Sequence, residues 1–440
     1  MITNTNSSPH QTRRDFIKTS AAVGSALAVP VILSGNLFAA ENSDTLRVGL
    51  VGCGGRGTGA ASQALHADKN VVLTALGDAF PEPLQNCLKN LQGEKDLADK
   101  INVAPDHCFV GLDAYQKVLD SGVDVVLLCS PPGFRPVHFQ AAVAAGKHIF
   151  CEKPMATDAT GARAVLAAVK QAQAKQLSIL AGFCWRYEYA RREFYQKLHA
   201  GAIGDIRAVY ANYYTGPVKP MPLASARPKE MGDLEWQMRN WYNFVWLSGD
   251  GLVEQACHSV DKIAWALKDV PPLKAVAVGG RQTKNNEGNI YDHMFVVYDF
   301  PGDVQAFLGQ RQINNCYTEN SDYIMGSEGV GKITGAAGPV IHGKQTWRYG
   351  GYTSANRDMY QNEHNEFFAG LRSGQHLNDG ERMVQSTLLG IMGRMAAYTG
   401  QEVTWEEVLN SKEELVPQSL DWNMHLPIPP IAIPGTTKLI

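Results

Sequence analysis

The first half of the chain alternates short apolar runs with segments whose composition suits helices. The apolar, β-prone runs lie at 46–51, 71–76, 123–129, 148–151 and 177–183. The helix-compatible segments lie at 58–67, 135–145 and 159–175. Near-continuous apolar strands that alternate with helices are typical of a parallel sheet covered on both faces. The pattern therefore predicts a doubly wound α/β domain, whose ligands bind beyond the carboxyl ends of its strands.

The second half of the chain, from about Tyr187, shows a different pattern. Its β-prone runs follow one another with few helical segments between them, at 206–214, 273–281, 293–300, 304–312 and 323–325. Longer helical patterns lie at 250–267, 362–371 and 382–398. Strands joined without crossover helices favour an antiparallel sheet. We therefore predict a second α/β domain built on a large, mostly antiparallel sheet.

The N-terminal segment has the composition of an export signal. A twin-arginine pattern, Arg13-Arg14, precedes a mildly apolar run at 21–33 and small residues at Ala39-Ala40. A charged start, an apolar middle and a small-residue end are typical of a signal peptide, and twin arginines indicate a periplasmic destination. The apolar run is too short to span a bilayer by itself. The alternative is an uncleaved amphipathic arm.

Composition narrows the class of protein. Hydrophobic residues make up 45% and charged residues 19%, as expected for a globular chain and not for a disordered one. The formal charge is −3, and removal of residues 1–40, which carry +2, leaves −5. A near-balanced chain argues against nucleic acid as the main partner. Eight cysteines in 440 residues are too few for a disulfide-stapled scaffold.

A glycine-rich loop follows the first predicted strand. The segment Gly52-Cys53-Gly54-Gly55-Arg56-Gly57 is a G-x-G-x-x-G motif between a strand and a helix, and the next strand leads to Asp78. Such glycines let backbone N–H groups approach a pyrophosphate at a helix N-terminus. A carboxylate about 20 residues further on binds a ribose 2′-hydroxyl and would repel a 2′-phosphate. The motif predicts a Rossmann domain that prefers NAD to NADP, a preference that Arg56 can soften.

These patterns divide the chain into four parts. The predicted parts are a signal peptide at 1–40, an NAD-binding Rossmann domain at 41–186, a second α/β domain at 187–417 and an extended, proline-containing tail at 418–440. Two folded domains agree with a soft prior of about 150 residues per domain.

Further motifs extend this interpretation. They are Ser130-Pro131-Pro132, the run AGKHIFCEKP at 145–154, the run GLVEQACHSVD at 251–261 and Gly326-Ser327-Glu328-Gly329. Together with the glycine loop, they resemble the glucose–fructose oxidoreductase/inositol dehydrogenase/MocA family from about Leu46 to Pro417. The resemblance implies a Rossmann domain followed by an open-faced α/β domain, a bound nicotinamide cofactor and polyol or sugar substrates. Arg239-Asn240-Trp241 resembles a subgroup that is common among exported members.

The resemblance also implies which residues contact the cofactor. They are Gly52, Gly54, Gly55, Arg56, Gly57, Asp78, Ser130, Pro131, Pro132, His138, Glu152 and Lys153. The expected cofactor is NAD, with NADP as the less favoured alternative.

Lys153 is the main catalytic candidate. Oxidation of a secondary alcohol needs an acceptor for the hydroxyl proton and a cation or donor for the developing alkoxide. A lysine can fill both roles, and burial beside a positively charged nicotinamide would lower its pKa toward the working range. The resemblance places Lys153 near the nicotinamide and the reacting carbon. The alternative is a surface lysine that follows a strand.

Glu254 and His258 form a second candidate group. They stand four apart in one helical pattern, so we expect them on one helix face, with the carboxylate setting the tautomer of the imidazole. The family usually has Asp where this chain has Glu254. Without the resemblance, a lone helical histidine is better interpreted as a core residue. A metal site is the other alternative, but no third ligand stands out, and we expect no metal.

Five further residues are candidates for contact with substrate. Tyr187 is a candidate for proton transfer and Arg186 for substrate binding, because both follow the last Rossmann strand; packing at a hinge is the alternative. Arg239 and Trp241 lie in an aromatic-rich segment that suits sugar rings, or equally a packed domain or subunit contact. Asp261 lies one helical turn beyond the candidate histidine, where it orients that imidazole or the sugar, or lies on the helix surface.

Export limits how such an enzyme uses its cofactor. Free NAD is expected to be scarce in the periplasm, and the twin-arginine route moves folded proteins, so cofactor can be loaded beforehand. We therefore expect an NAD-dependent oxidoreductase that acts on a secondary hydroxyl of a sugar, glycoside or cyclitol and recycles a tightly bound cofactor. One alternative is a redox-neutral glycosidase resembling NAD-dependent α-N-acetylgalactosaminidases, with His258 or Tyr187 as the base at C2. The other is a non-catalytic, cofactor-bearing sugar-binding protein.

The expected partners follow from the same considerations. A small carbohydrate is the expected ligand, and no nucleic acid or membrane-spanning segment is expected in the mature chain. The family often dimerises through its second sheet, which implies a homo-oligomer.

Overall fold

The structure, a computed structural model, describes residues 44–440 apart from 285, 336–337 and 352–356. The predicted export signal at 1–40 lies outside the described residues. Those described belong to one compact unit. Among them, no helix combines the length and the apolar content that crossing a bilayer requires.

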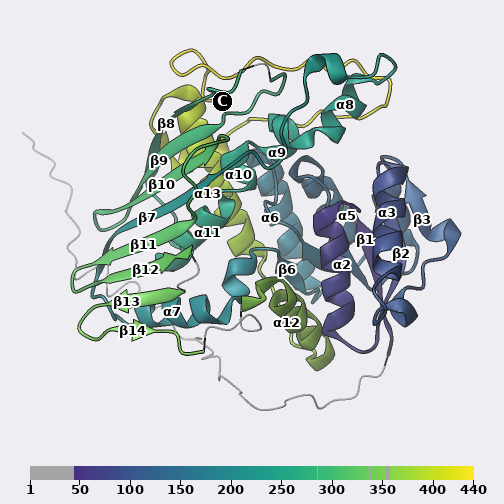
Figure 1. The fold of residues 1–440 in the computed structure, drawn as a ribbon, viewed down its shortest axis with the longest axis horizontal. Coiled ribbons are helices and arrows are strands. Elements are labelled where there is room, and N and C mark those ends of the chain that lie inside the picture. Colours follow the sequence, from purple (N-terminus) through teal and green to yellow (C-terminus); the bar gives the residue numbers. More distant parts are fainter. Residues whose placement is uncertain (1–43, 285, 336–337, 352–356) are drawn as a thin grey trace, which may run out of the picture. The chain divides into compact units, whose positions relative to one another are not determined.

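A parallel sheet forms the first part of the unit, as the apolar runs predicted (Figure 1). Its strands are β1 (Leu46–Val51), β2 (Val71–Asp78), β3 (Cys108–Val110), β4 (Val125–Leu128), β5 (His148–Cys151) and β6 (Ile179–Ala181). The accompanying helices are α2 (Gly55–Ala67), α3 (Pro81–Gln92), α4 (Ala114–Asp120), α5 (Arg135–Ala144) and α6 (Ala159–Ala174). The strand order β3-β2-β1-β4-β5-β6, with every pairing parallel, is that of a Rossmann domain.

Burial explains why the central strands are apolar throughout. All four residues of β4 are buried, because helices cover both faces of the sheet. The order reverses between β1 and β4, so the carboxyl ends of these two strands form the switch point at which such sheets bind ligands.

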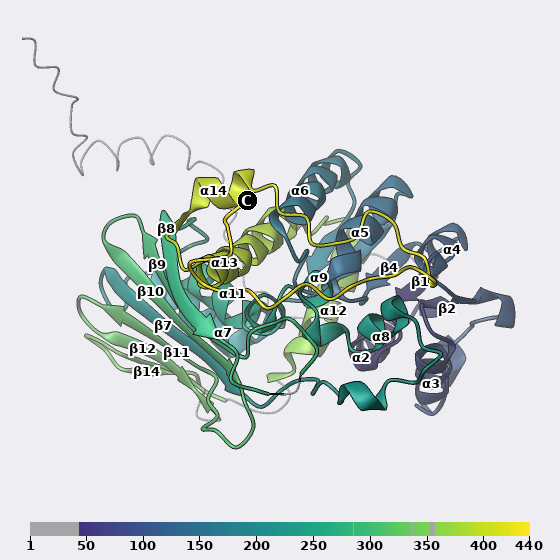
Figure 2. The same ribbon diagram turned by 90° about the horizontal axis from the view of Figure 1, so that it is seen from above.

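A second, mostly antiparallel sheet follows (Figure 2). Its strands are β7 (Ile206–Thr215), β8 (Lys274–Gly280), β9 (His293–Phe300), β10 (Val304–Gln312), β11 (Ser321–Gly326), β12 (Val330–Thr334), β13 (Pro339–His342), β14 (Trp347–Arg348) and β15 (Val403–Thr404). In the described part of the chain it has nine strands in the order β14-β13-β12-β11-β7-β10-β9-β8-β15. Only the β7–β10 pairing is parallel among these, so the predicted fold class is confirmed.

Helices cover one face of this second sheet. The helices in this part of the chain are α7 (Tyr189–His199), α8 (Asp233–Arg239), α9 (Val245–Ser248), α10 (Gly251–Glu254), α11 (Cys257–Ala266), α12 (Met359–Ser373), α13 (Gly380–Thr399) and α14 (Trp405–Asn410). In β8, Ala275 is buried whereas Val276 and Val278 are exposed, which is the alternation of a sheet with one covered face. Phe295 of β9 is also exposed, so this face presents apolar side chains to solvent.

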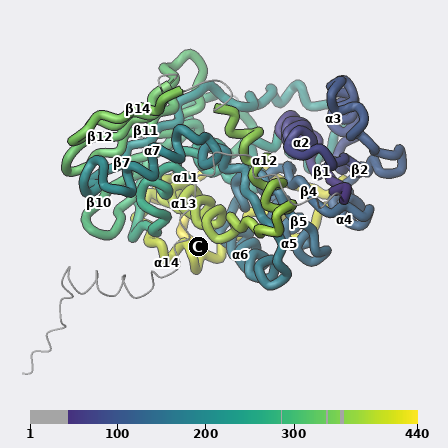
Figure 3. The backbone as a smooth tube through the Cα atoms, turned by 90° about the horizontal axis from the view of Figure 1, so that it is seen from below, coloured from purple at the N-terminus to yellow at the C-terminus, as the bar shows by residue number. Residues whose placement is uncertain are grey.

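Two helices late in the chain return to the first sheet. Helix α12 packs alongside α2 of the Rossmann part, and Figure 3 shows the two running side by side. Helix α13 contacts both α6 and β8, and nearly all of its residues from Met383 onward are buried. The two sheets therefore share a core through α13.

A third, smaller apolar cluster joins distant segments. Its buried members lie in and around α8 and α9, and they include Trp236, Phe244 and Trp246. Side chains of the C-terminal tail between Leu415 and Ile428 pack against it, as do Phe80 and other residues from Rossmann loops. We call this set the cover cluster. Figure 2 shows the tail running past α9 and α8.

Candidate active site

The glycine loop between β1 and α2 is shaped by close backbone contacts. Gly52 has φ +95°, a left-handed conformation that favours glycine, and a Cβ there would lie 2.6 Å from the backbone of Cys129. A Cβ on Gly57 would lie 1.9 Å from the carbonyl oxygen of Gly52. The first and last glycines of the motif are thus required by the fold of the loop itself.

Gly54 and Gly55 serve a different purpose. A Cβ at either position would have no protein atom within 4 Å, so these glycines are not needed for internal packing. They stand at the start of α2, where unpaired backbone N–H groups and the helix dipole favour an anion. Open space at a helix N-terminus fits a pyrophosphate, and the loop therefore fits the dinucleotide that the motif predicted.

Asp78 ends β2 beside this loop. Its carboxylate accepts hydrogen bonds from the backbone N–H groups of Cys53, at 2.7 Å, and Phe80, at 3.0 Å. Burial raises the pKa of Asp78, and these N–H groups oppose that shift. The carboxylate is thus held in place with acceptor capacity remaining for ribose hydroxyls.

Arg56 points to partners other than Asp78. Its Nε lies 2.7 Å from Oε1 of Glu152, and its guanidinium lies 4.7 Å from the ring centroid of Tyr360. A further hydrogen bond of 2.6 Å runs to Gln63. Because these contacts occupy the guanidinium, Arg56 is poorly placed to attract a 2′-phosphate.

One cavity of about 640 Å³ gathers most of the predicted site residues. Its walls include the glycine loop and Asp78 on one side and Lys153, Glu254 and His258 on another. The other predicted residues that line it are Arg56, Ser130, Pro131, Pro132, His138, Glu152, Arg239 and Trp241. A volume of this size lies within the usual range for small-molecule and cofactor sites.

The Ser130-Pro131-Pro132 turn is supported from behind by His138. Oγ of Ser130 lies 3.0 Å from Nδ1 of His138, whose ring stacks on Tyr115 at 4.2 Å between centroids. Burial, reinforced by the charge of Arg135, lowers the pKa of His138 to about 3. This neutral imidazole is therefore a support for the turn.

Lys153 forms a buried ion pair with Glu254. Its Nζ lies 2.9 Å from Oε1 of Glu254 and 2.7 Å from the backbone carbonyl oxygen of the same residue. Burial opposes the charged form, but the carboxylate outweighs this effect and raises the pKa of Lys153. The expected lowering of this pKa is not what the protein environment produces: the chain holds Lys153 as a cation.

His258 lines the same cavity as a neutral imidazole. Burial and the nearby charge of Lys153 lower its pKa well below the usual value. Its Nδ1 is buried and makes no hydrogen bond to any residue that the structure describes. A neutral imidazole in this position is a proton acceptor close to a fixed cation.

The predicted pairing of Glu254 with His258 is wrong. Glu254 is the last residue of α10, and His258 is the second residue of α11. The helical path breaks at Gln255 and Ala256, and although both side chains line the cavity, none of the described contacts joins them. Glu254 instead pairs with Lys153, and the carboxylate does not set the tautomer of the imidazole.

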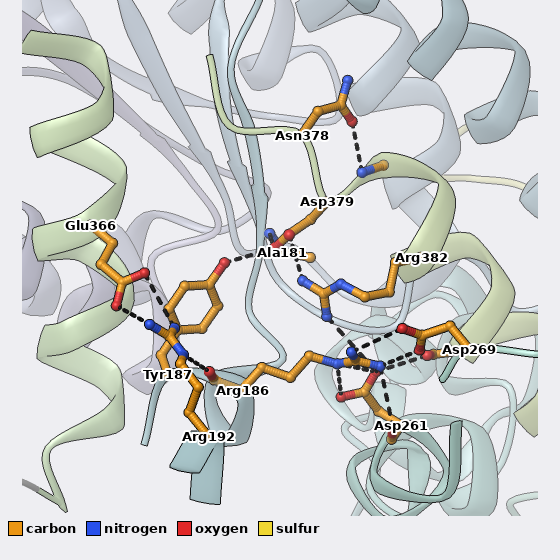
Figure 4. Close-up of polar contacts among 12 residues, drawn as sticks. Ala181, Arg186, Tyr187, Arg192, Asp261, Asp269, Glu366, Asn378, Asp379 and Arg382 are labelled. Atoms are coloured by element: carbon orange, nitrogen blue, oxygen red, sulfur yellow. Dashed lines mark hydrogen bonds and ion pairs between the residues drawn. The ribbon is translucent and has the colours of Figure 1, made fainter. Parts of the chain in front are cut away.

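Three predicted site residues lie outside the cavity, in a buried polar network (Figure 4). Arg186, in the turn Cys184–Tyr187 after β6, forms an ion pair with Asp261 at 2.9 Å and another with Asp269 at 2.5 Å. The Tyr187 hydroxyl donates to Asp379 at 2.9 Å. Their side chains satisfy one another across the junction of the two sheets. The assignments of Tyr187 to proton transfer and of Arg186 and Asp261 to substrate are therefore revised to structural roles.

Arg239 and Trp241 line the cavity beside α8. The Arg239 guanidinium lies 4.1 Å from the ring centroid of Phe80 and pairs with Glu235 at 2.7 Å. Phe80 follows β2, so Arg239 borders the end of the cavity that contains Asp78. Trp241 packs edge-on against Tyr242 and also lines the cavity.

Several cavity residues were missed at the level of sequence, among them three that lie together. Tyr213 of β7 donates to Oε1 of Gln255 at 2.9 Å, and both side chains line the cavity with Trp185. Burial raises the pKa of Tyr213 to about 12, and Lys153 opposes that shift. The strand alternation that turns Tyr213 inward is visible in the sequence. The sequence does not show that β7 borders the cavity that contains the glycine loop of the first sheet.

No described group of three or more histidine, cysteine, aspartate or glutamate side chains is arranged to hold a metal ion. The described cysteines are all free thiols.

The Rossmann part of the chain matches the model of a known protein family. Residues 46–179 match the model of the oxidoreductase family with an NAD-binding Rossmann fold, Gfo/Idh/MocA. An inositol 2-dehydrogenase of Cereibacter sphaeroides is 25% identical over 293 residues, which are 66% of this chain and 74% of that protein.

Solved structures share the fold over most of the unit. The WlbA dehydrogenase from Bordetella pertussis, in complex with NADH and UDP-GlcNAcA, aligns with a TM-score of 0.63 at 20% identity, over 82% of this chain and 98% of that one. The aldose–aldose oxidoreductase from Caulobacter crescentus, complexed with glycerol, aligns with a TM-score of 0.62 at 18% identity, over 82% and 99%.

Proposed function

We propose that this chain, whose residues 46–179 form the NAD-binding domain of a Gfo/Idh/MocA-type oxidoreductase, oxidises a secondary hydroxyl of a sugar, glycoside or cyclitol with NAD that stays bound between turnovers. The observation that carries the proposal is the union, in one cavity, of the glycine loop, Asp78, the cation Lys153 and the neutral base His258. Relatives of this type act on inositol, and one is a dehydrogenase that binds a sugar nucleotide with NADH.

The side chains divide the reaction between them. Bound NAD⁺ would supply the hydride acceptor. His258, a neutral imidazole on the cavity wall, takes the hydroxyl proton as the alcohol is oxidised. Lys153, held as a cation by Glu254, stabilises the negative charge that develops on the same oxygen. Reduction of a second carbonyl substrate uses the same groups in reverse.

Three observations support NAD over NADP. The fixed carboxylate of Asp78 would repel a 2′-phosphate, and Arg56 is engaged by Glu152 and Gln63. Arg239 is likewise paired with carboxylates. We expect replacement of Asp78 by Ala to lower the preference for NAD by roughly tenfold or more, because it removes both the ribose acceptor and the repulsion.

The cover cluster supports a retained cofactor. Met238 and Phe80 belong to this cluster and also line the cavity, so the cavity wall is backed by the C-terminal tail. Retention agrees with the twin-arginine pattern at Arg13-Arg14 and with a periplasmic location, which we propose on that pattern alone.

The test of this proposal is the cofactor content and turnover of the purified protein. Acid extraction is expected to release about one NAD per chain, and a reactive sugar is expected to reduce it in a single turnover without added NAD. A second aldose or ketose should then reoxidise it. Protein that holds no nucleotide and turns over only with excess free NAD⁺ contradicts the closed cycle, although it leaves the oxidoreductase intact.

A redox-neutral glycosidase is the second candidate. The unpartnered neutral imidazole of His258 favours it, because abstraction of an acidified C2 proton after oxidation at C3 needs such a base. Nitrophenyl glycosides discriminate between the two reactions. Release of nitrophenol with deuterium exchange at C2 supports the glycosidase, and the absence of both supports simple dehydrogenation.

We also propose self-association through the open face of the second sheet. Val276, Val278 and Phe295 expose apolar surface on adjacent strands β8 and β9. Val278→Glu is expected to shift the protein to a smaller assembly in sedimentation experiments, and an unchanged mass would contradict this interface.

A further inference from the structure

A second cavity, of about 720 Å³, adjoins the catalytic one at Trp185. Trp185 belongs to the walls of both cavities, and β7 supplies neighbouring residues to each: Tyr213 to the first, Tyr214 and Thr215 to the second. The remaining wall of the second cavity comes largely from the β10–β11 connection, including Tyr317 and Asn320. Arg357 and Met359, around the start of α12, also line it, and Trp185 is the residue that the two walls share.

Two cations hold the Trp185 side chain, and one of them, Arg191, also lines the second cavity. The Arg191 guanidinium lies 3.8 Å from its ring centroid, and Nζ of Lys262 lies 5.2 Å away. Both cations pair with Asp322, Lys262 at 2.8 Å and Arg191 at 3.4 Å. The three charged residues are at most 5% exposed, and such burial is costly unless each charge is compensated. The cluster thus fixes an indole between two cavities, which is a preformed stacking surface.

The lining of the second cavity suits a sugar ring. Trp185 and Tyr317 offer aromatic faces, and Tyr317 is 71% exposed, as a stacking residue at a cavity mouth would be. Thr215 and Asn320 add hydroxyl and amide groups. The carboxylate of Glu319 is already oriented by Asn212 at 2.7 Å and by Tyr323 at 3.2 Å, so its remaining acceptor capacity is preorganised.

We propose that this second cavity binds a further sugar unit, linked to the one that is oxidised, so that the substrate is a disaccharide or longer glycoside. The inference rests on the proposed oxidation of a sugar hydroxyl in the catalytic cavity. It adds that recognition continues across Trp185, with the second ring against Trp185 and Tyr317. A free monosaccharide would fill only the catalytic side.

The experiment compares methyl glycosides of glucose, galactose, mannose and N-acetylglucosamine with the corresponding β-1,4-linked disaccharides. Initial rates of glycoside oxidation are measured over a range of concentrations for wild type, Tyr317→Ala and the control Ile433→Ala, an exposed position (59%) that lines neither cavity. Wild type is expected to favour at least one disaccharide over its methyl glycoside by about tenfold or more in kcat/KM.

Tyr317→Ala is expected to raise KM for that disaccharide by roughly five- to tenfold, with kcat and the methyl-glycoside values unchanged. Ile433→Ala should leave both sets of values at the wild-type level. Equal efficiency on both substrate classes, or a Tyr317→Ala variant that behaves as wild type on the disaccharide, overturns the second sugar site while the proposed oxidation stands. Failure of wild type to oxidise any compound of either class overturns the proposed function itself.

Discussion

At the scale of single residues, the site is decided by which partner each charge takes. The sequence predicted a lowered pKa for Lys153 and a contact in which the Glu254 carboxylate sets the tautomer of His258. Glu254 pairs with Lys153 instead, so the lysine stays charged and the imidazole stays neutral. The sequence contained the three residues but not the choice of partner, because that choice depends on a helix break at Gln255 that no motif marks.

Removal of the Lys153 charge is expected to lower kcat without loss of the fold. Lys153→Met should reduce single-turnover reduction of bound NAD by about 10²- to 10³-fold, since one preorganised donor to a developing oxyanion contributes on that order. Lys69→Met changes an exposed lysine and should leave the rate at the wild-type level. Near-normal turnover by Lys153→Met with correct cofactor content would remove Lys153 from the chemistry.

The pH dependence of kcat/KM follows from the two perturbed groups. The proton acceptor must be neutral, and the pKa of His258 is lowered, so the acid limb is expected below pH 6.5. The cation must stay charged, and the pKa of Lys153 is raised, so the alkaline limb is expected above pH 10.5 or beyond the stable range. In Lys153→Met the acid limb should move up toward 6.5, because a positive charge beside His258 is lost. A wild-type limb at or above 6.5 would contradict the assignment of His258 as the base.

At the scale of elements, the strands and helices of the Rossmann part were largely predictable. Strands β1 and β5 occupy their predicted ranges, because continuous apolar runs ending in glycine or proline motifs leave little choice. The pattern at 250–267 failed as one helix, since α10 and α11 have similar composition on both sides of their break. The packing of α12 on α2 was also not predictable from sequence. An amphipathic pattern shows that a helix has a buried face but does not show which helix covers it.

Two glycines of the loop have different roles: Gly57 is needed for the fold of the loop, and Gly54 leaves space for the ligand. Gly57→Ala places a Cβ 1.9 Å from a carbonyl oxygen, so we expect a loss of about 1–3 kcal/mol in the free energy of unfolding and loss of bound NAD. Gly54→Ala meets no protein atom and has φ −70°, so its stability without ligand should match wild type. It should nevertheless lose NAD, since its methyl group occupies the space that the pyrophosphate needs.

Urea unfolding and nucleotide extraction on the two variants check this contrast. A Gly54→Ala variant that keeps its full NAD content would show that the pyrophosphate does not lie over this loop.

At the scale of the whole molecule, the two sheets are joined by buried ion pairs as well as by apolar contacts. Arg186, directly after the first sheet, reaches Asp261 in α11, and Arg382 of α13 pairs with Asp379 next to Tyr187. Three residues predicted to touch substrate thus hold the halves together. From sequence alone, charged residues after a terminal strand fit either role, and only the fold places their partners.

Asp261→Asn is expected to destabilise the protein while sparing the chemistry. Loss of one carboxylate leaves the buried Arg186 with Asp269 alone, which should cost about 3 kcal/mol in the free energy of unfolding. The kcat of the folded protein should stay within about twofold of wild type, since Asp261 does not line the cavity. Asp106→Asn, at an exposed position, is the control. A large fall in kcat with unchanged stability would return Asp261 to the substrate site.

The cover cluster also has a consequence for the order of events in the cell. The tail residues between Leu415 and Ile428, which back the wall around Met238 and Phe80, are translated after every other element that borders the cavity. While the tail is still being synthesised, the Rossmann strands and the glycine loop have already emerged from the ribosome. A nucleotide can then enter the cavity before the tail packs behind its wall. We expect docking of the tail then to stiffen the wall around Met238 and Phe80 over a nucleotide that is already in place. Cofactor capture is in this view a step of biosynthesis, timed by the C-terminal segment.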